Sequence, residues 1–149
     1  MRSRIFPGFG FAPSLLFMKK PKSIHENTYT LRRTSRSTTT VTFDELLKIV
    51  IVLDESGSMG PIKYQIIKSF NELISEQEEI LERPATFTLV KFNNDVKRVM
   101  VNKLLINITP LSYQDYQPDG STALYDAIGD TIEWFRNEKN VLMIIVTDG

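Results

Sequence analysis

The feature that most constrains this chain is an apolar run that ends abruptly in a polar, glycine-containing segment. Residues 46–53 read LLKIVIVL, and DESGSMG follows at residues 54–60. A run of this length, bounded by a turn signal, is typical of a strand that is covered on both faces in a parallel sheet. Asp54, Ser56 and Ser58 then stand at alternate positions, so an extended backbone turns their oxygen atoms to the same side.

Around this strand, the chain from residue 41 alternates between strand and helix patterns. Pro61 suits the first position of a helix, and apolar residues recur at helical spacing as far as Pro84. Two strands at residues 85–92 and 96–101 then form a hairpin, and a long loop follows at residues 104–121. A second helix at residues 122–137 leads to a last apolar strand at residues 141–146. This order predicts the α/β class, as a doubly wound, Rossmann-like and mainly parallel sheet with an antiparallel edge hairpin.

Oxygen-bearing side chains fall in loops at strand ends or at a helix start. In open α/β sheets ligands bind at the carboxyl ends of the strands, and two apolar strands here end at Leu53-Asp54 and Thr147-Asp148. Hard oxygen ligands suit Mg²⁺, and a carboxylate from outside could complete its coordination. The candidate metal ligands are Asp54, Ser56, Ser58, Thr122 and Asp148.

These residues carry a family resemblance that spans residues 44–149. DESGSMG resembles the Asp-x-Ser-x-Ser motif of the von Willebrand factor A (VWA) domain, DGSTALYDAIG its second segment and IIVTDG its third, in the family's order. The resemblance implies a metal-ion-dependent adhesion site that holds Mg²⁺ or Mn²⁺ and to which a partner protein donates an Asp or Glu side chain. It also implies the strand order 3-2-1-4. The expected function is a metal-dependent protein-binding module for adhesion or scaffolding.

The C-terminal end departs from the family pattern. VWA domains continue past the Thr-Asp-Gly segment with further helices and strands, so we expect residues 41–149 to form a partial, C-terminally incomplete domain. Residues 141–146 would then be an uncovered apolar edge strand, which is an aggregation hazard. The sheet is expected to need a missing C-terminal segment or another chain to complete it, and residues 1–149 alone are not expected to form a stable monomer.

The formal net charge of zero hides a basic N-terminal part and an acidic body. Residues 1–40 hold eight Lys or Arg and one acid, whereas residues 41–149 hold ten Lys or Arg and 17 Asp or Glu. We expect residues 1–40 to be a basic, disordered tail, in which residues 19–40 read as a linker and Met18 is an alternative start.

The composition argues against nucleic acid and membranes as partners and favours one cellular location. An acidic body is a poor binder of nucleic acid. The apolar stretch at residues 5–17 is too short to span a membrane, so no membrane partner is expected. The chain has no cysteine, which fits a reducing compartment and predicts a cytoplasmic location.

An enzyme is the main alternative class. A Mg²⁺-dependent phosphatase of the haloacid-dehalogenase type needs a second Asp where this chain has Ser56, and a serine hydrolase needs a histidine base, whereas the only histidine is His25 in the tail. We therefore expect no catalytic residues and no enzymatic activity. A Mg²⁺-dependent hydrolase and a non-functional truncated fragment remain the alternatives to a binding module.

Other acids close to the motifs have different predicted roles. Glu55 should point away from Asp54 and Ser56 and be structural or solvated. Asp119 is expected to form a turn. Asp126, on the surface of the second helix, is expected to lie near the site, where it would support the metal ligands without binding the metal itself.

Overall fold

Two separate sheets contain all the strands in the described part of the chain, which divides into two units between Thr42 and Phe43. This computed structural model describes residues 17–19, 28–33, 37–80 and 84–148, of which residues 17–19, 28–33, 37–40 and 78–80 are described by their backbone alone. The N-terminal unit is an antiparallel sheet of β1 (Phe17–Lys19), β2 (Thr28–Arg33) and β3 (Ser37–Thr42), in the order β1-β2-β3.

These strands differ from the disordered tail and linker that the composition predicted. Strands β2 and β3 pair from Thr28↔Thr42 to Arg33↔Ser37. The Ser- and Thr-rich composition suggested a linker, but threonine is β-branched and has a high strand propensity. Met18 lies in β1, while residues 1–16 and His25 lie outside the described residues.

The second unit contains the predicted α/β fold. Its sheet has the order β6-β5-β4-β7, in which β4 pairs parallel with both β5 and β7 and β5 pairs antiparallel with β6. This confirms the mainly parallel sheet, the edge hairpin and the strand order 3-2-1-4. The elements are η1 (Phe43–Glu45), β4 (Leu47–Asp54), η2 (Gly57–Ile62), α1 (Lys63–Ile80), β5 (Ala85–Phe92), β6 (Val96–Leu104), η3 (Leu105–Asn107), α2 (Leu124–Phe135) and β7 (Val141–Val146).

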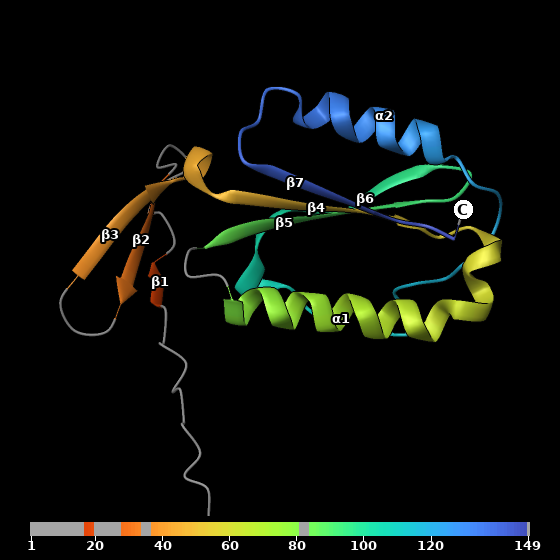
Figure 1. Ribbon diagram of the computed structural model, residues 1–149, viewed down its shortest axis with the longest axis horizontal. Coiled ribbons are helices and arrows are strands. Elements are labelled where there is room, and N and C mark those ends of the chain that lie inside the picture. The colour runs from red at the N-terminus through yellow and green to blue at the C-terminus, as the bar shows by residue number, and fades with distance from the viewer. Residues whose placement is uncertain (1–16, 20–27, 34–36, 81–83, 149) are drawn as a thin grey trace, which may run out of the picture. The chain divides into compact units, whose positions relative to one another are not determined.

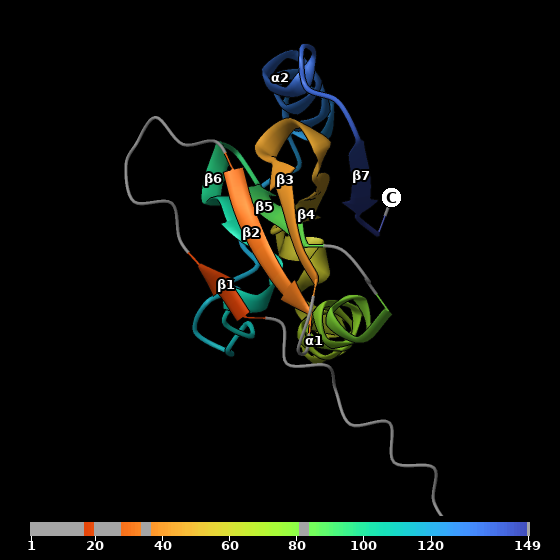
Figure 2. The ribbon, with the colours of Figure 1, turned by 90° about the vertical axis from the view of Figure 1, so that its left-hand side faces the viewer.

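Helices α1 and α2 cover opposite faces of this sheet (Figures 1 and 2). Because side chains alternate along a strand, Ile49, Ile51 and Leu53 of β4 join the core cluster that includes Phe70 of α1, whereas Val52 joins the cluster that includes Ala127 of α2. Strand β4 is thus buried on both faces, as its apolar run, interrupted only by Lys48, predicted.

Three element boundaries differ from the sequence prediction. The α-helix begins at Lys63 rather than Pro61, because residues 57–62 form a 3₁₀ helix, a common start to an α-helix. Strand β6 continues to Leu104 rather than ending at residue 101. Helix α2 begins at Leu124, so Thr122 lies in the loop before it rather than at its first position.

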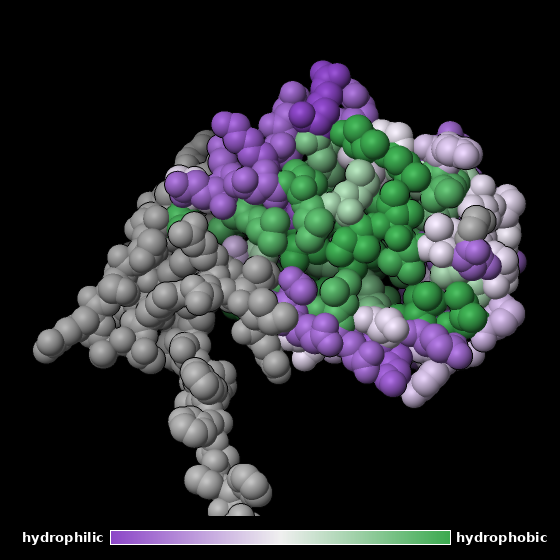
Figure 3. All heavy atoms as spheres, in the orientation of Figure 1, coloured by the Kyte–Doolittle hydropathy of each residue, from purple (hydrophilic) through white to green (hydrophobic). Residues whose placement is uncertain are grey.

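Strand β7 lies at one edge of the sheet, with β4 as its one strand partner among the described residues. Its Leu142 and Ile145 side chains are 46% and 41% exposed. In Figure 3 hydrophobic side chains cover the face of the molecule between α1 and α2, where β7 runs. None of the helices described here is long and apolar enough to cross a membrane.

Candidate metal centre

The carboxyl end of β4 places a buried acid at the point where the sheet ends. Asp54 has no solvent-exposed surface. Its Oδ1 accepts a hydrogen bond from the Ser56 N–H at 2.8 Å, and its Oδ2 accepts one from the Thr147 hydroxyl at 2.7 Å. None of the ion pairs in the described residues involves Asp54. A buried carboxylate is usually paired with a cation or bound to a metal, and no Lys or Arg side chain that the structure describes pairs with Asp54.

Two hydroxyls and a second carboxylate continue from Asp54 in a chain of short contacts. The Ser56 and Ser58 hydroxyl oxygens are 3.1 Å apart, and the Ser58 hydroxyl donates to Asp148 Oδ1 at 3.0 Å. Asp148 reaches this position because β7 pairs in parallel with β4, with Leu53 opposite Val146, so both strands end at the same edge. The structure therefore brings Asp54, Ser56, Ser58 and Asp148 together.

The fifth predicted ligand, Thr122, lies in a loop that is bonded to the same edge. The Gly57 N–H donates to the Gly120 carbonyl at 3.0 Å, two residues before Thr122. The Ala123 N–H, one residue after it, donates to the Asn93 carbonyl at 2.9 Å. The backbone is thus held on both sides of Thr122, whose own side chain is exposed.

The separations of these oxygens suit a magnesium-sized ion. Adjacent ligands of a regular octahedron are about 1.4 times the metal–oxygen distance apart, so Mg²⁺ at about 2.1 Å requires neighbouring oxygens about 3.0 Å apart. The Ser56–Ser58 and Ser58–Asp148 separations of 3.1 and 3.0 Å are hydrogen-bond distances that are also compatible with that spacing. The described residues hold no group of three or more His, Cys, Asp or Glu side chains placed for a metal, so a ligand set at this edge would have to include hydroxyls.

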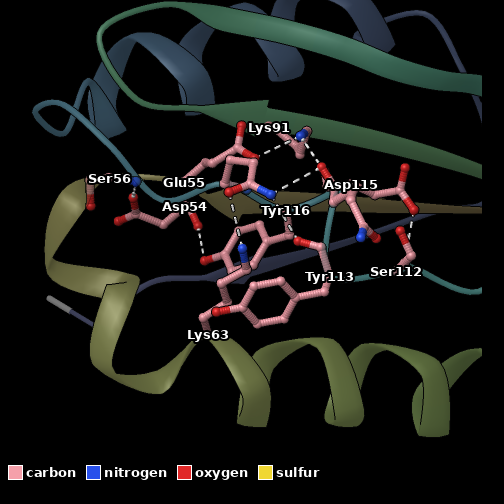
Figure 4. A network of polar contacts seen from close by, with 11 residues as sticks. Asp54, Glu55, Ser56, Lys63, Lys91, Ser112, Tyr113, Asp115 and Tyr116 are labelled. Atoms are coloured by element: carbon pink, nitrogen blue, oxygen red, sulfur yellow. Dashed lines mark hydrogen bonds and ion pairs between the residues drawn. The ribbon is translucent and has the colours of Figure 1, made fainter.

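Glu55, beside this site, has a structural role, which is one of the two roles that the sequence predicted for it. It is buried, and its Oε1 accepts hydrogen bonds from Lys91 Nζ and from the Gln117 N–H, both at 2.7 Å (Figure 4). Lys91 also donates to the Asp115 carbonyl at 2.7 Å. The Glu55 carbonyl accepts from the Asp119 N–H at 2.9 Å. Glu55 therefore joins the end of β4 to the segment at residues 115–119.

Tyr116 completes this connection and was missed by sequence reasoning. Its ring is fully buried, and its hydroxyl donates to the Asp54 carbonyl at 2.5 Å. Burial raises the pKa of Tyr116 far above its usual value, and the negative charges of Asp54, Glu55 and Asp148 raise it further. The loop showed no periodic pattern from which this contact could have been inferred.

Two further contacts fix the same loop against α1. Asn71 exchanges two hydrogen bonds with the backbone of Leu111, at 3.0 and 2.8 Å. Lys63 donates to Gln117 Oε1 at 3.1 Å, and its Nζ lies 3.6 Å from the centre of the Tyr113 ring (Figure 4). The loop at residues 111–117 is therefore anchored to both α1 and the end of β4.

The other acids near the motifs take separate positions. Asp119 accepts a hydrogen bond from the Gly120 N–H at 2.8 Å, which fits its predicted turn role. Asp126 is exposed in the first turn of α2. Hydrogen bonds from Ser112 lower the pKa of Asp115. Asp130 pairs with Arg98 of β6.

Comparisons with known proteins identify the domain family and its fold. The family model of the von Willebrand factor type A domain matches residues 48–149, and curated proteins give no significant match. Among solved structures, the ArnB paralog VWA2 from Sulfolobus acidocaldarius is similar, with a TM-score of 0.54, 20% sequence identity, and coverage of 82% of this chain and 31% of that one. A von Willebrand factor type A protein from Catenulispora acidiphila gives a TM-score of 0.46 and 16% identity, covering 79% of this chain and 27% of that one. The chain spans less than a third of the length of either structure.

Proposed function

The chain belongs to the von Willebrand factor type A domain family, whose members are generally protein-interaction modules, and we propose that it binds a partner's Asp or Glu side chain through a divalent cation. The observation that carries this proposal is the run of oxygens from buried Asp54 through Ser56 and Ser58 to Asp148.

Each residue of the candidate site has a definite part in this proposal. Asp54, Ser56, Ser58, Thr122 and Asp148 would hold Mg²⁺ or Mn²⁺, and the bound ion supplies a positive charge that attracts a carboxylate from outside. The hydrogen bonds from Ser56 N–H and the Thr147 hydroxyl fix the orientation of Asp54. Ser58 and Asp148 are exposed, so a partner can reach the side of the site that they form.

A binding role is favoured over catalysis by the chemistry of the side chains at this edge. Ser56, which takes the place of the acid that a phosphatase would need, has its hydroxyl beside that of Ser58. A serine nucleophile of the hydrolase type is activated by an imidazole, whereas the described neighbours of the two hydroxyls are each other and the Asp148 carboxylate. We therefore propose that the site is not enzymatic. The cytoplasmic location that the lack of cysteine favours likewise stays a prediction.

The proposal is tested by titrating the protein with Mg²⁺ and with Mn²⁺ by calorimetry. We expect saturable binding of one ion, and Asp54→Ala should abolish it. Bound metal should also stabilise the fold, by about 2.7 kcal/mol at a metal concentration of 100 times Kd. Glu72→Ala is the matched control, because Glu72 is an exposed acid that pairs with Lys68 on α1.

Two results would contradict the proposal. Equal metal binding by wild type and Asp54→Ala would show that this edge of the sheet is not the site. Hydrolysis of a phosphate ester or a carboxylic ester that is lost in Asp54→Asn would place the protein among the hydrolases.

A further inference from the structure

The two halves of the candidate metal site come from segments that are far apart in the sequence. One half is the segment at residues 54–58, and the other is the loop that carries Thr122. Residues 54–57 bond to residues 116–120 at four points: Asp54 carbonyl to Tyr116 hydroxyl, Glu55 Oε1 to Gln117 N–H, Glu55 carbonyl to Asp119 N–H, and Gly57 N–H to Gly120 carbonyl. These contacts set how closely the two halves approach.

Glu55 provides the side-chain part of this connection. Its Oε1 holds the Gln117 N–H and Lys91 Nζ at the same distance of 2.7 Å, and Lys91 holds the Asp115 carbonyl at 2.7 Å. The Glu55 and Lys91 side chains are only 8% and 13% exposed, so water competes little for these bonds. We call Glu55, Lys91 and Gln117 the loop clamp.

We propose that Glu55 is a positioning residue of the metal site: through the loop clamp it holds the Thr122 loop at the distance from Ser56 and Ser58 that a small cation requires. This inference rests on the proposed metal-binding function. We assign Glu55 no ligand role, because its Oε1 is already engaged by the Gln117 N–H and by Lys91 Nζ. Mg²⁺ demands near-ideal octahedral geometry, so a loop that drifts by a fraction of an ångström weakens binding.

Preorganisation is the physical reason for the expected effect. If the loop were free, metal binding would have to order it, and the entropy lost would lower the affinity. Partners that orient metal ligands typically change metal affinity by about 10- to 100-fold when they are mutated. The competing explanation is that Glu55 acts through its negative charge, which attracts the cation from a distance.

Two conservative variants separate these explanations. Glu55→Gln removes the charge but keeps an Oε1 acceptor at the same reach, whereas Glu55→Asp keeps the charge but is one methylene too short to make both 2.7 Å contacts. Positioning predicts that Glu55→Gln binds Mn²⁺ within about threefold of wild type and that Glu55→Asp binds about tenfold more weakly or worse. A charge effect predicts the reverse order.

The experiment measures Mn²⁺ affinity by calorimetry for wild type, both Glu55 variants and Glu72→Gln, an exposed control on α1. Amide deuterium exchange of the metal-free proteins adds a readout that does not depend on the ion. Exchange at Gln117 should rise in Glu55→Asp and stay slow in Glu55→Gln.

The outcomes are distinct. Weak binding by Glu55→Gln with normal binding by Glu55→Asp would overturn the inference in favour of a charge effect, and wild-type affinity in both variants would show that Glu55 positions nothing. If wild type and Asp54→Ala bind Mn²⁺ equally, the proposed function fails instead, and the exchange at Gln117 still reports whether the loop clamp exists.

Discussion

Replacing Tyr116 with Phe should destabilise the fold by removing one buried hydroxyl while keeping the ring. The Tyr116 ring is fully buried, and its hydroxyl donates to the Asp54 carbonyl at 2.5 Å. A buried acceptor that loses its donor costs about 1–3 kcal/mol. We therefore expect Tyr116→Phe to lower the free energy of unfolding by that amount at pH 8, which is a large fraction of the roughly 5–15 kcal/mol that stabilises a typical domain.

The same substitution should change how stability depends on pH. Burial and the nearby carboxylates raise the pKa of Tyr116 in the folded protein, whereas in the unfolded chain a tyrosine ionises near pH 10. A raised folded-state pKa contributes stability that is fully present below about pH 10 and is lost as the pH rises above it. At pH 11, ionisation favours the unfolded wild type by about 1.4 kcal/mol. Phe does not ionise, so the cost of Tyr116→Phe should shrink by that amount between pH 8 and pH 11.

Urea unfolding at pH 8 and pH 11, followed by circular dichroism, measures both effects. Tyr125→Phe is the matched control, because Tyr125 is 88% exposed and its substitution should change the free energy of unfolding by less than about 0.5 kcal/mol. A cost of Tyr116→Phe that is the same at both pH values would refute the argument that folding holds this hydroxyl in its protonated form. No cost at pH 8 would refute the contribution of the hydrogen bond.

The remaining predictions concern a glycine and a buried lysine. Gly120→Ala should lower stability by about 1–2 kcal/mol, because Gly120 has a φ of +77° and an added Cβ would lie 2.9 Å from the Asn94 side chain. Thermal melting checks this against Gly129→Ala in α2, where an added Cβ meets nothing within 4 Å, and a smaller loss in Gly120→Ala would contradict it. Lys48→Met should lower the free energy of unfolding by about 1–3 kcal/mol, because buried Lys48 donates to two backbone carbonyls. Glu138→Gln alters only the half-exposed ion-pair partner of Lys48, so it should lower the free energy of unfolding by less than about 1 kcal/mol. Equal costs for these two variants in urea unfolding would show that the ion pair outweighs the hydrogen bonds.

The sequence was most informative where its pattern is regular. The nearly continuous apolar run of β4, interrupted only by Lys48, predicted a strand covered on both faces, and the alternation of strands and helices predicted the mainly parallel sheet. Burial on two faces leaves a direct mark on composition, because most positions of such a strand are apolar. At residues 28–33 and 37–42 the composition suggested a tail and linker where the structure has strands, since threonine also favours strands.

Within the candidate site, the sequence by itself determined the types of ligand and which strand ends carry them. Asp54 ends β4 and Ser56 is extended, as their alternate spacing predicted, whereas Ser58 lies in the 3₁₀ helix Gly57–Ile62, so its approach to Ser56 depends on that turn rather than on an extended backbone. The approach of Asp148 follows from parallel pairing, which places the carboxyl ends of β4 and β7 at one edge. Whether these residues and Thr122 bind a metal remains a prediction.

Only the tertiary structure decided what holds the site in shape. Glu55, Lys91 and Tyr116 bond the end of β4 to a loop about 60 residues further along the chain. That loop has no periodic pattern, so the sequence could not show that Tyr116 is buried or that Gln117 meets Glu55. The spacing of apolar residues predicts helices and strands because their backbone hydrogen bonds repeat at a fixed period. Contacts between distant loops have no such period, because they depend on how α1, the sheet and the loop pack together.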